Sequence, residues 1–394
     1  MTAAPRFLDR ATPPHVATLV AMAGVQALAT SIFLPSLAHM AEDFGVSYGT
    51  MQLSVSLFFV ASAILQVALG AVADAVGRRP VLLWSFAGFV AATLGCLLAT
   101  DIVVFLLCRM AQAVAVAGLV LGRAIIRDSA GPERSASLIG YVTMAMAVLP
   151  MLGPVAGGAL DEAADWRASF VLLLVAGLLV LALAAADLGE TARPRPGGAA
   201  AQVRAYPALL GSRAFWAYAL CAAFASGAYF ALLGGAALVA GAFGLSPLWT
   251  GVALGAPTVG YILGNFLSGR NGGRVGLDRM AALGCAVATA GPALALALVA
   301  LGWESPWAVF APCVLLGLGN GLTLPNVMAG SISVRPDLAA SAAGLSGALM
   351  TAGGAVLAAV AAQAVTPATG PWPLLAIMAA SSALAGLSLL LRRR

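Results

Sequence analysis

The chain has 394 residues, of which 61% are hydrophobic and 9% are charged, and its mean hydropathy is +0.99. Soluble domains are about 45–50% apolar and about 25% charged, so this composition excludes an ordinary soluble protein. The net charge is +5, and the twenty basic residues, all arginine, are spread over many short segments. Such a spread argues against nucleic acid as a partner. The composition predicts an all-α integral membrane protein.

Apolar runs long enough to cross a bilayer recur along the whole chain. A helix needs about 20 apolar residues to span about 30 Å of hydrocarbon. Breaks at charged or Pro- and Gly-rich points give twelve predicted transmembrane helices, at 16–37, 49–71, 81–99, 102–124, 136–159, 167–187, 213–237, 248–268, 280–301, 306–330, 339–362 and 371–391. The first run leads directly into a second, so we interpret it as a span and not as a cleavable signal peptide.

The arginines also predict the orientation in the membrane, because positive charges flank the cytoplasmic ends of membrane helices. With the N-terminus inside, Arg167 is the loop arginine that falls on the outer side, while the outer loops hold acids such as Asp43, Asp161 and Glu162. We therefore expect a multi-pass protein of the cell inner (cytoplasmic) membrane with both termini in the cytoplasm.

A long polar break after the sixth span divides the chain into two parts. It predicts an N-terminal six-helix half at 1–188, a cytoplasmic linker at 189–212 and a C-terminal six-helix half at 213–394. The stretch "LGAVADAVGRR" around Gly70 is echoed by "SGRNGGRVGLDR" around Gly269. Likewise "VVFLLC" at 103–108 is echoed by "AVFAPC" at 308–313, so that Arg109 corresponds to Val314. Repeated halves are typical of secondary transporters, which bind substrate between the halves and rock them to alternate access.

Three motifs combine glycine with charged or amide residues. They are "GAVADAVGRRP" with Gly70, Asp74, Gly77, Arg78 and Arg79; "RMAQAVAVAG" with Arg109 and Gln112; and "LPMLGPVAGG" with Gly153, Pro154, Gly157 and Gly158. Glycines allow close helix approach, and a carboxylate among arginines can form a charge network or meet a helix N-terminus. Together the motifs resemble the loop, fourth-helix and fifth-helix motifs of the major facilitator superfamily.

A narrower resemblance covers nearly the whole chain. The segments "IFLPSL", "MQLSVSLFFV", "IIRDSAG", "DWRASF", "GETARP" and "SRAFWAYAL" resemble the Bcr/CflA branch of drug/proton antiporters, especially its chloramphenicol and florfenicol exporters. This resemblance implies multidrug efflux and antibiotic resistance, with protons as the coupling ion, a small-molecule substrate and a monomeric protein in the lipid bilayer. No Walker motif is present, so we expect a gradient-driven transporter rather than an enzyme, without cofactor or metal.

Arg109 is the charge that lies inside a predicted span, roughly 10 Å from its outer end at about 1.5 Å per residue. Snorkelling to the surface is one interpretation, and facing an internal cavity is the other. The resemblance implies acids in the first helix, but Ala23 and Ser31 occupy those positions. Arg109 should therefore be satisfied by Gln26, Ser31, a backbone carbonyl, water or an anionic substrate.

Further polar and aromatic residues within the spans are candidates for a substrate cavity. They are Gln26, Thr30, Gln52, Gln112, Tyr141, Tyr229, Phe230, Tyr261, Asn320 and Asn326. Aromatic and amide side chains suit an amphipathic guest in a mostly apolar pocket, although each alone is also consistent with helix packing.

Three hypotheses about function stay open. The first is a secondary active exporter of small amphipathic compounds, with phenicol-like drugs as the specific expectation and with proton coupling. The second is a uniporter or exchanger of an anionic metabolite, with Arg109 as its counter-ion. The third is a transport-inactive membrane sensor, which the missing first-helix acids would favour.

Overall fold

The computed structural model describes residues 6–129, 149, 152–191, 206–303, 305–335, 338–366 and 368–392, and in this part the chain forms helices and no strand. The elements labelled in order are α1 (Val16–Ser31), η1 (Leu34–Ser36), α2 (Leu37–Asp43), α3 (Tyr48–Val76), α4 (Arg78–Leu98), α5 (Ile102–Gln112), η2 (Ala113–Ala115), α6 (Val116–Ser129), α8 (Arg167–Asp187), α10 (Arg213–Ala242), α11 (Pro247–Val275), α12 (Leu277–Ala300), α13 (Pro306–Phe310), α14 (Cys313–Ser333), α15 (Ala339–Ala364), α16 (Trp372–Ser388) and η4 (Leu389–Arg392). Residues 152–163 and 206–210 are also helical.

Ten helical stretches in the described part are long and apolar enough to cross a membrane. They confirm the prediction of an all-α, multi-pass membrane protein. The helix at 152–163 and α11 lie at the positions of two more predicted spans. Most of the predicted span 136–159, including Tyr141, lies outside the described residues.

Three predicted spans are not single regular helices. The span 16–37 ends as α1 at Ser31 and continues through η1, which contains Pro35, into α2. The span 102–124 is divided by η2 at Ala113–Ala115, and the span 306–330 is divided at Ala311 and Pro312. At the first and third breaks, Pro35 and Pro312 lack a backbone N–H and interrupt the helical hydrogen-bond ladder, a local effect that average hydropathy does not detect. The break at η2 contains no proline.

Local chemistry explains where several helices begin and end. The side chains of Ser47, Asp101 and Ser212 accept hydrogen bonds from the first backbone N–H groups of α3, α5 and α10. Gly77 (φ 108°) separates α3 from α4, and Gly276 (φ 84°) separates α11 from α12. Only glycine adopts such backbone angles without strain, so the sequence repeat produces the same helix junction twice.

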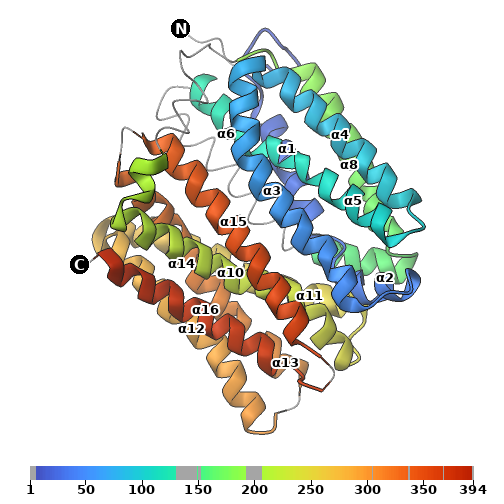
Figure 1. The fold of residues 1–394 in the computed structure, drawn as a ribbon, viewed down its shortest axis with the longest axis vertical. Coiled ribbons are helices and arrows are strands. Elements are labelled where there is room, and N and C mark those ends of the chain that lie inside the picture. The colour runs from blue at the N-terminus through green and yellow to red at the C-terminus, as the bar shows by residue number, and fades with distance from the viewer. Residues whose placement is uncertain are drawn as a thin grey trace.

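The helices gather into two groups, seen at the upper right and lower left of Figure 1. We call α1–α8 with the helix 152–163 the N-terminal bundle, and α10–α16 the C-terminal bundle. Each bundle is held mostly by its own helix contacts. The predicted boundaries at 188 and 212 stay a prediction, because 192–205 lie outside the described residues.

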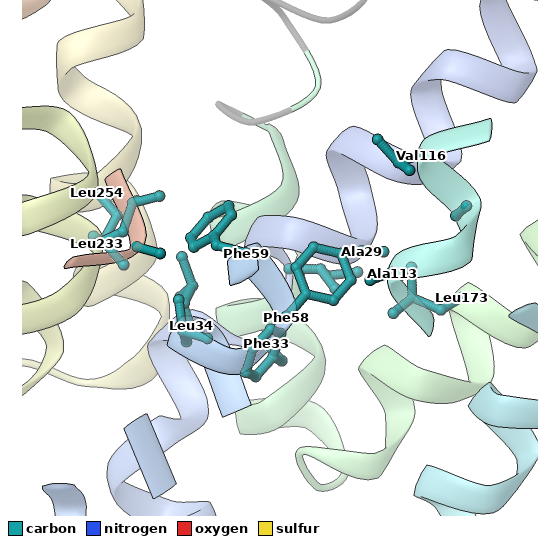
Figure 2. Packing of buried hydrophobic residues seen from close by; sticks show 14 of the residues in the cluster. Ala29, Phe33, Leu34, Phe58, Phe59, Ala113, Val116, Leu173, Leu233 and Leu254 are labelled. Carbon is teal, nitrogen blue, oxygen red and sulfur yellow. The ribbon is translucent and has the colours of Figure 1, made fainter. Parts of the chain in front are cut away.

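The two ends of the molecule differ in their contacts. At the end where the chain begins and finishes, Asp187 of α8 accepts hydrogen bonds from the backbone N–H groups of Leu8 and His15, 2.8 Å each. We call this the terminal end (Figure 1). At the opposite end the bundles meet, and Figure 2 shows Leu34 and Phe59 facing Leu233 and Leu254.

The helix 152–163 packs against α1 of its own bundle and against α11 of the C-terminal bundle through small residues. A methyl group added to Gly153 would overlap the Ser31 hydroxyl, and one added to Gly157 would overlap the Ile32 carbonyl, both of which lie in or just after α1. A methyl group on Gly158 would overlap the Pro247 carbonyl of α11. In return, Gly251 of α11 packs against the Pro154 carbonyl. Two glycine-bearing faces thus let this helix come close enough to α1 and α11 for backbone atoms to be in contact.

We expect Gly157→Ala to lower the free energy of unfolding by about 1–3 kcal/mol, because overpacking a close helix contact forces the backbones apart. Thermal unfolding of the purified protein in detergent, followed by tryptophan fluorescence, measures this change. Gly122→Ala is the matched control, since nothing lies within 4 Å of a methyl group there. That variant should be neutral or slightly more stable, and equal midpoints for the two variants would contradict the packing argument.

Candidate functional site

Arg109 lies in the core of the N-terminal bundle with 0% of its surface exposed. Its Nη1 donates to Gln112 Oε1 at 2.5 Å, and its Nη2 donates to the Ala29 carbonyl at 3.3 Å. The guanidinium carbon lies 4.3 Å from the ring centroid of Phe33 and 4.6 Å from that of Phe58. Figure 2 shows these two rings close together beside Ala29. The side chain is enclosed by protein and does not snorkel to the surface.

The hydrogen-bonded network continues from Gln112 into α4. Gln112 Nε2 donates to Thr93 Oγ1 at 2.7 Å, and Thr93 Oγ1 donates to the Phe89 carbonyl at 2.7 Å. Among the described residues, the hydrogen-bond partners of Arg109 are an amide and a backbone carbonyl, with no carboxylate. Ser31 donates to the Ala27 carbonyl instead. Ring faces and carbonyl dipoles therefore stabilise the buried cation.

A cavity of about 240 Å³ lies in the C-terminal bundle. Its lining residues come from α10, α11, α14 and α15: Ser226, Tyr229, Phe230, Pro257, Thr258, Tyr261, Gly317, Asn320, Leu324 and Met350. Four of the predicted candidates, Tyr229, Phe230, Tyr261 and Asn320, are thus brought to one site. Arg109 and Gln112 are not among the residues that line it.

The cavity lies beside the contact between the bundles. The ring centroids of Phe230 and Phe59 of α3 are 4.4 Å apart, with the rings nearly edge to face. Asn320 Oδ1 is buried and has no hydrogen-bond partner among the described residues. An aromatic wall with an unsatisfied amide oxygen suits an amphipathic guest that carries a hydrogen-bond donor.

The other predicted candidates lie elsewhere. Asn326 joins α14 to α11, since its Nδ2 donates to Ser268 Oγ and to the Leu322 carbonyl, 2.7 Å each. Gln26 and Gln52 are buried in the N-terminal bundle at 8% and 1% exposure, and Thr30 donates back to the Gln26 carbonyl. These four contribute to the bundle cores and do not line the cavity.

Sequence reasoning did not identify several lining residues, such as Pro257, Gly317 and Met350. Gly317 of α14 packs against the Pro257 carbonyl of α11, where a methyl group would overlap it. The proline inside α11 was the sequence feature that could have marked this position, because proline interrupts the backbone hydrogen bonds of a helix. Apolar lining residues otherwise carry no pattern that distinguishes them from ordinary core residues.

The loop motif at the terminal end meets a carboxylate from a distant segment. Glu190 accepts hydrogen bonds from the backbone N–H groups of Arg78 (3.0 Å) and Arg79 (3.3 Å), which begin α4. Arg79 Nε donates to the Leu188 carbonyl at 2.8 Å. An acid at a helix N-terminus is favourable for the helix dipole. Glu190, in the segment "GETARP", therefore supplies the carboxylate at the N-terminus of α4. We had expected a carboxylate within the motif itself to make this contact.

The remaining motif residues are placed as follows. Nothing lies within 4 Å of a methyl group on Gly70, whereas one on Gly77 would contact the Glu190 carboxylate. The backbone of Asp74 lies in α3, and its side chain lies outside the described part of the chain. The structure thus accounts for Gly77, Arg78 and Arg79 of this motif.

At the opposite end, polar contacts join the bundles across their interface. Glu162 Oε1 accepts a hydrogen bond from the Leu248 N–H at the start of α11 (3.1 Å), and Tyr48 donates to the Gly234 carbonyl (3.4 Å). Hydrogen bonds from the Ser246 hydroxyl and the Leu248 amide hold the pKa of Glu162 below its usual value. The contact is present above the ordinary pKa of a glutamate and is lost as pH falls through the lowered pKa.

Comparison with known proteins identifies the family. The profile described as "Major Facilitator Superfamily" matches residues 19–359. The chain belongs to the Major Facilitator Superfamily. It is a transporter and not an enzyme, and the peptide transporter POT, solved in complex with sulfate, shares the fold at a TM-score of 0.74 and 14% identity, over 96% of this chain and 94% of that one.

Curated relatives refine this membership. The chain is 34% identical over 269 residues to the MFS-type transporter YdgK of Bacillus subtilis, covering 66% of this chain and 67% of the relative. It is 28% identical over 359 residues to multidrug resistance protein D of Escherichia coli, covering 89% of each chain. It is 29% identical to the chloramphenicol resistance protein of Pseudomonas aeruginosa, covering 79% and 72%. These names agree with the resemblance to the Bcr/CflA branch.

For this superfamily member we expect Gln112→Leu to lower the free energy of unfolding by about 1.5–3 kcal/mol, since it removes a charge-assisted bond to buried Arg109. Gln112→Glu keeps an acceptor and adds a countercharge, so its free energy of unfolding should stay closer to that of the parent. Thermal unfolding midpoints of the detergent-solubilised variants measure the difference. Equal stability of Gln112→Leu and the parent would contradict a stabilising role for this bond.

Proposed function

We propose that this transporter is a secondary active exporter of small amphipathic compounds. The observation that carries this proposal is the cavity beside the bundle interface, which is lined by Tyr229, Phe230, Tyr261 and Asn320. The buried Oδ1 of Asn320 has no hydrogen-bond partner in the part of the chain that the structure describes. Such a site binds by apolar contact and a few oriented hydrogen bonds. Relatives named for multidrug and chloramphenicol resistance support phenicol-like drugs as the specific substrate class.

Alternating access is the transport mechanism we infer for the two bundles. The helix 152–163 and α3 hold the opposite end closed through Glu162, Gly158 and Tyr48. Opening this end requires breaking those contacts. The arginine distribution supports a cytoplasmic terminal end in the inner membrane, and the monomer is the expected transport unit.

Coupling to protons is part of the proposal, although it cannot use the first-helix acids of related exporters. Ala23 and Ser31 occupy those positions and are buried at 0% and 1% exposure. Among the described residues, the buried acids are Asp161 and Asp187, which lie near the two ends of the N-terminal bundle. Proton movement therefore has to involve groups near the bundle ends or in the segments outside the described residues.

The alternative is a uniporter or exchanger of an anionic metabolite with Arg109 as its counter-ion. The absence of a carboxylate partner for Arg109 among the described residues favours it. Complete burial of Arg109 outside the cavity lining weighs against it. The third hypothesis, an inactive sensor, leaves the cavity and the closely packed bundle interface without a use.

Transport into liposomes distinguishes these functions. We expect the reconstituted protein to move chloramphenicol only when a pH gradient is imposed, and to leave a panel of carboxylates untouched. Arg109→Gln should then still bind the neutral drug but fail to couple its movement to the gradient. Liposomes without protein, and liposomes with a collapsed gradient, are the controls.

The opposite pattern would replace the proposal by its alternative. If carboxylates exchange freely without a gradient, and Arg109→Gln abolishes their binding, the anion transporter is the correct function. If no solute moves in either arm while the protein remains folded, the sensor is favoured.

Two asparagines provide a matched test of the cavity. We expect Asn320→Ala to raise the Kd for chloramphenicol about three- to tenfold, the effect of losing one hydrogen bond. Asn326→Ala should leave the Kd unchanged and lower stability, since Asn326 joins α14 to α11. Calorimetric titration of both variants measures the affinities, and equal weakening by both would exclude a direct contact from Asn320.

A further inference from the structure

Three side chains from distant parts of the sequence meet at the opposite end of the N-terminal bundle. His39 lies in α2, Asp161 lies in the helix 152–163, and Asp165 lies in the turn before α8. His39 Nδ1 is 2.8 Å from Asp161 Oδ1. One imidazole nitrogen and one oxygen from each carboxylate all lie within 4.8 Å of one another. The fold thus assembles a His/Asp/Asp cluster that the sequence did not suggest.

Asp161 is unusual for an acid because its side chain is 1% exposed. Its Oδ2 is buried and has no hydrogen-bond partner among the described residues, so His39 satisfies one oxygen of this carboxylate and leaves the other unsatisfied. A buried carboxylate oxygen without a partner is costly, and such groups are rare in folded proteins. This oxygen is therefore free to bind a ligand beside the hydrogen bond from His39.

Asp165 adds a second oxygen of the same kind. Its Oδ2 pairs with Arg167 Nη1 at 3.0 Å, while its Oδ1 is buried and has no partner in the described part of the chain. Arg167 is shared with Asp43, at 2.9 Å, so it does not neutralise the cluster alone. Each carboxylate thus has one buried oxygen without a partner in the described part of the chain. His39, with 51% of its side chain exposed, links the cluster to solvent.

We propose that His39, Asp161 and Asp165 bind a divalent transition-metal ion, with Zn²⁺ as the best match. Imidazole nitrogen with carboxylate oxygen is a donor set that Zn²⁺ accepts readily, whereas Mg²⁺ and Ca²⁺ prefer oxygen alone. Three protein ligands leave a fourth position for water. The ion satisfies the buried oxygen of Asp161 and balances both carboxylates.

The position of this site gives the ion a structural consequence. Asp161 directly precedes Glu162, which accepts the hydrogen bond from Leu248 of the C-terminal bundle. Bound metal ties α2, the helix 152–163 and the start of α8 together next to that contact. The ion therefore stabilises the N-terminal bundle at the end where the two bundles are closed.

The test is direct Zn²⁺ binding by the purified full-length protein in detergent, with its purification tag removed and with prior EDTA treatment. We expect calorimetry to show one site and the thermal unfolding midpoint to rise with Zn²⁺ but not with Mg²⁺. His39→Ala and Asp161→Asn should abolish both effects. Glu42→Gln, an exposed acid of α2, and His15→Ala, at the terminal end, are the matched controls and should bind like the parent.

Two results would overturn the proposal. One is the absence of saturable Zn²⁺ binding, which would leave the cluster as a simple His–Asp ion pair. The other is equal stabilisation of His39→Ala and the parent, which would indicate binding elsewhere. Because Asp161 is buried and its variant could misfold, His39→Ala and His39→Gln decide the outcome, with gel filtration as the folding control. None of these measurements depends on the transported substrate.

Discussion

The helix 152–163 packs so closely against α1 on one face and against α11 on another that backbone atoms are in contact. Gly153 and Gly157 form the first face, and Pro154 and Gly158 form the second, so residues four apart repeat along each contact. In a membrane, where lipid is as apolar as a side chain, helices associate through such close packing rather than through burial from water. The contacts of Gly158 and Gly251 join the two bundles at this end, and Glu162 adds a hydrogen bond beside them.

The two bundles share a helix junction but differ in their interiors. The N-terminal bundle encloses Arg109 among Gln112, the Ala29 carbonyl and the rings of Phe33 and Phe58. At the corresponding place the C-terminal bundle has Val314, whose carbonyl packs against Gly260. There the side of α14 near α10 and α11 borders an aromatic cavity. A charge buried by polar groups and rings in one half is thus accompanied by a mostly apolar cavity in the other.

Much of the fold was predictable because it depends on local and periodic properties of the chain. Apolar runs predicted the helices, and the echo around Gly70 and Gly269 indicated two related halves, in which the structure forms matching helix junctions at Gly77 and Gly276. The motifs also predicted that Gly157 and Gly158 permit close approach. The breaks at Pro35 and at η2 were missed, because hydropathy averages over about 20 residues and hydrogen-bond interruptions are local.

The sequence by itself determined a polytopic helical membrane protein of a transporter superfamily, because composition and glycine motifs act through local backbone chemistry. Only the tertiary structure decided which polar residues share a site. It brought Tyr229, Phe230, Tyr261 and Asn320 to one cavity, left Asn326 between helices, and placed Glu190 at the start of α4. These outcomes depend on the rotation of each helix about its axis and on contacts between segments more than 100 residues apart, which periodicity in one chain does not encode.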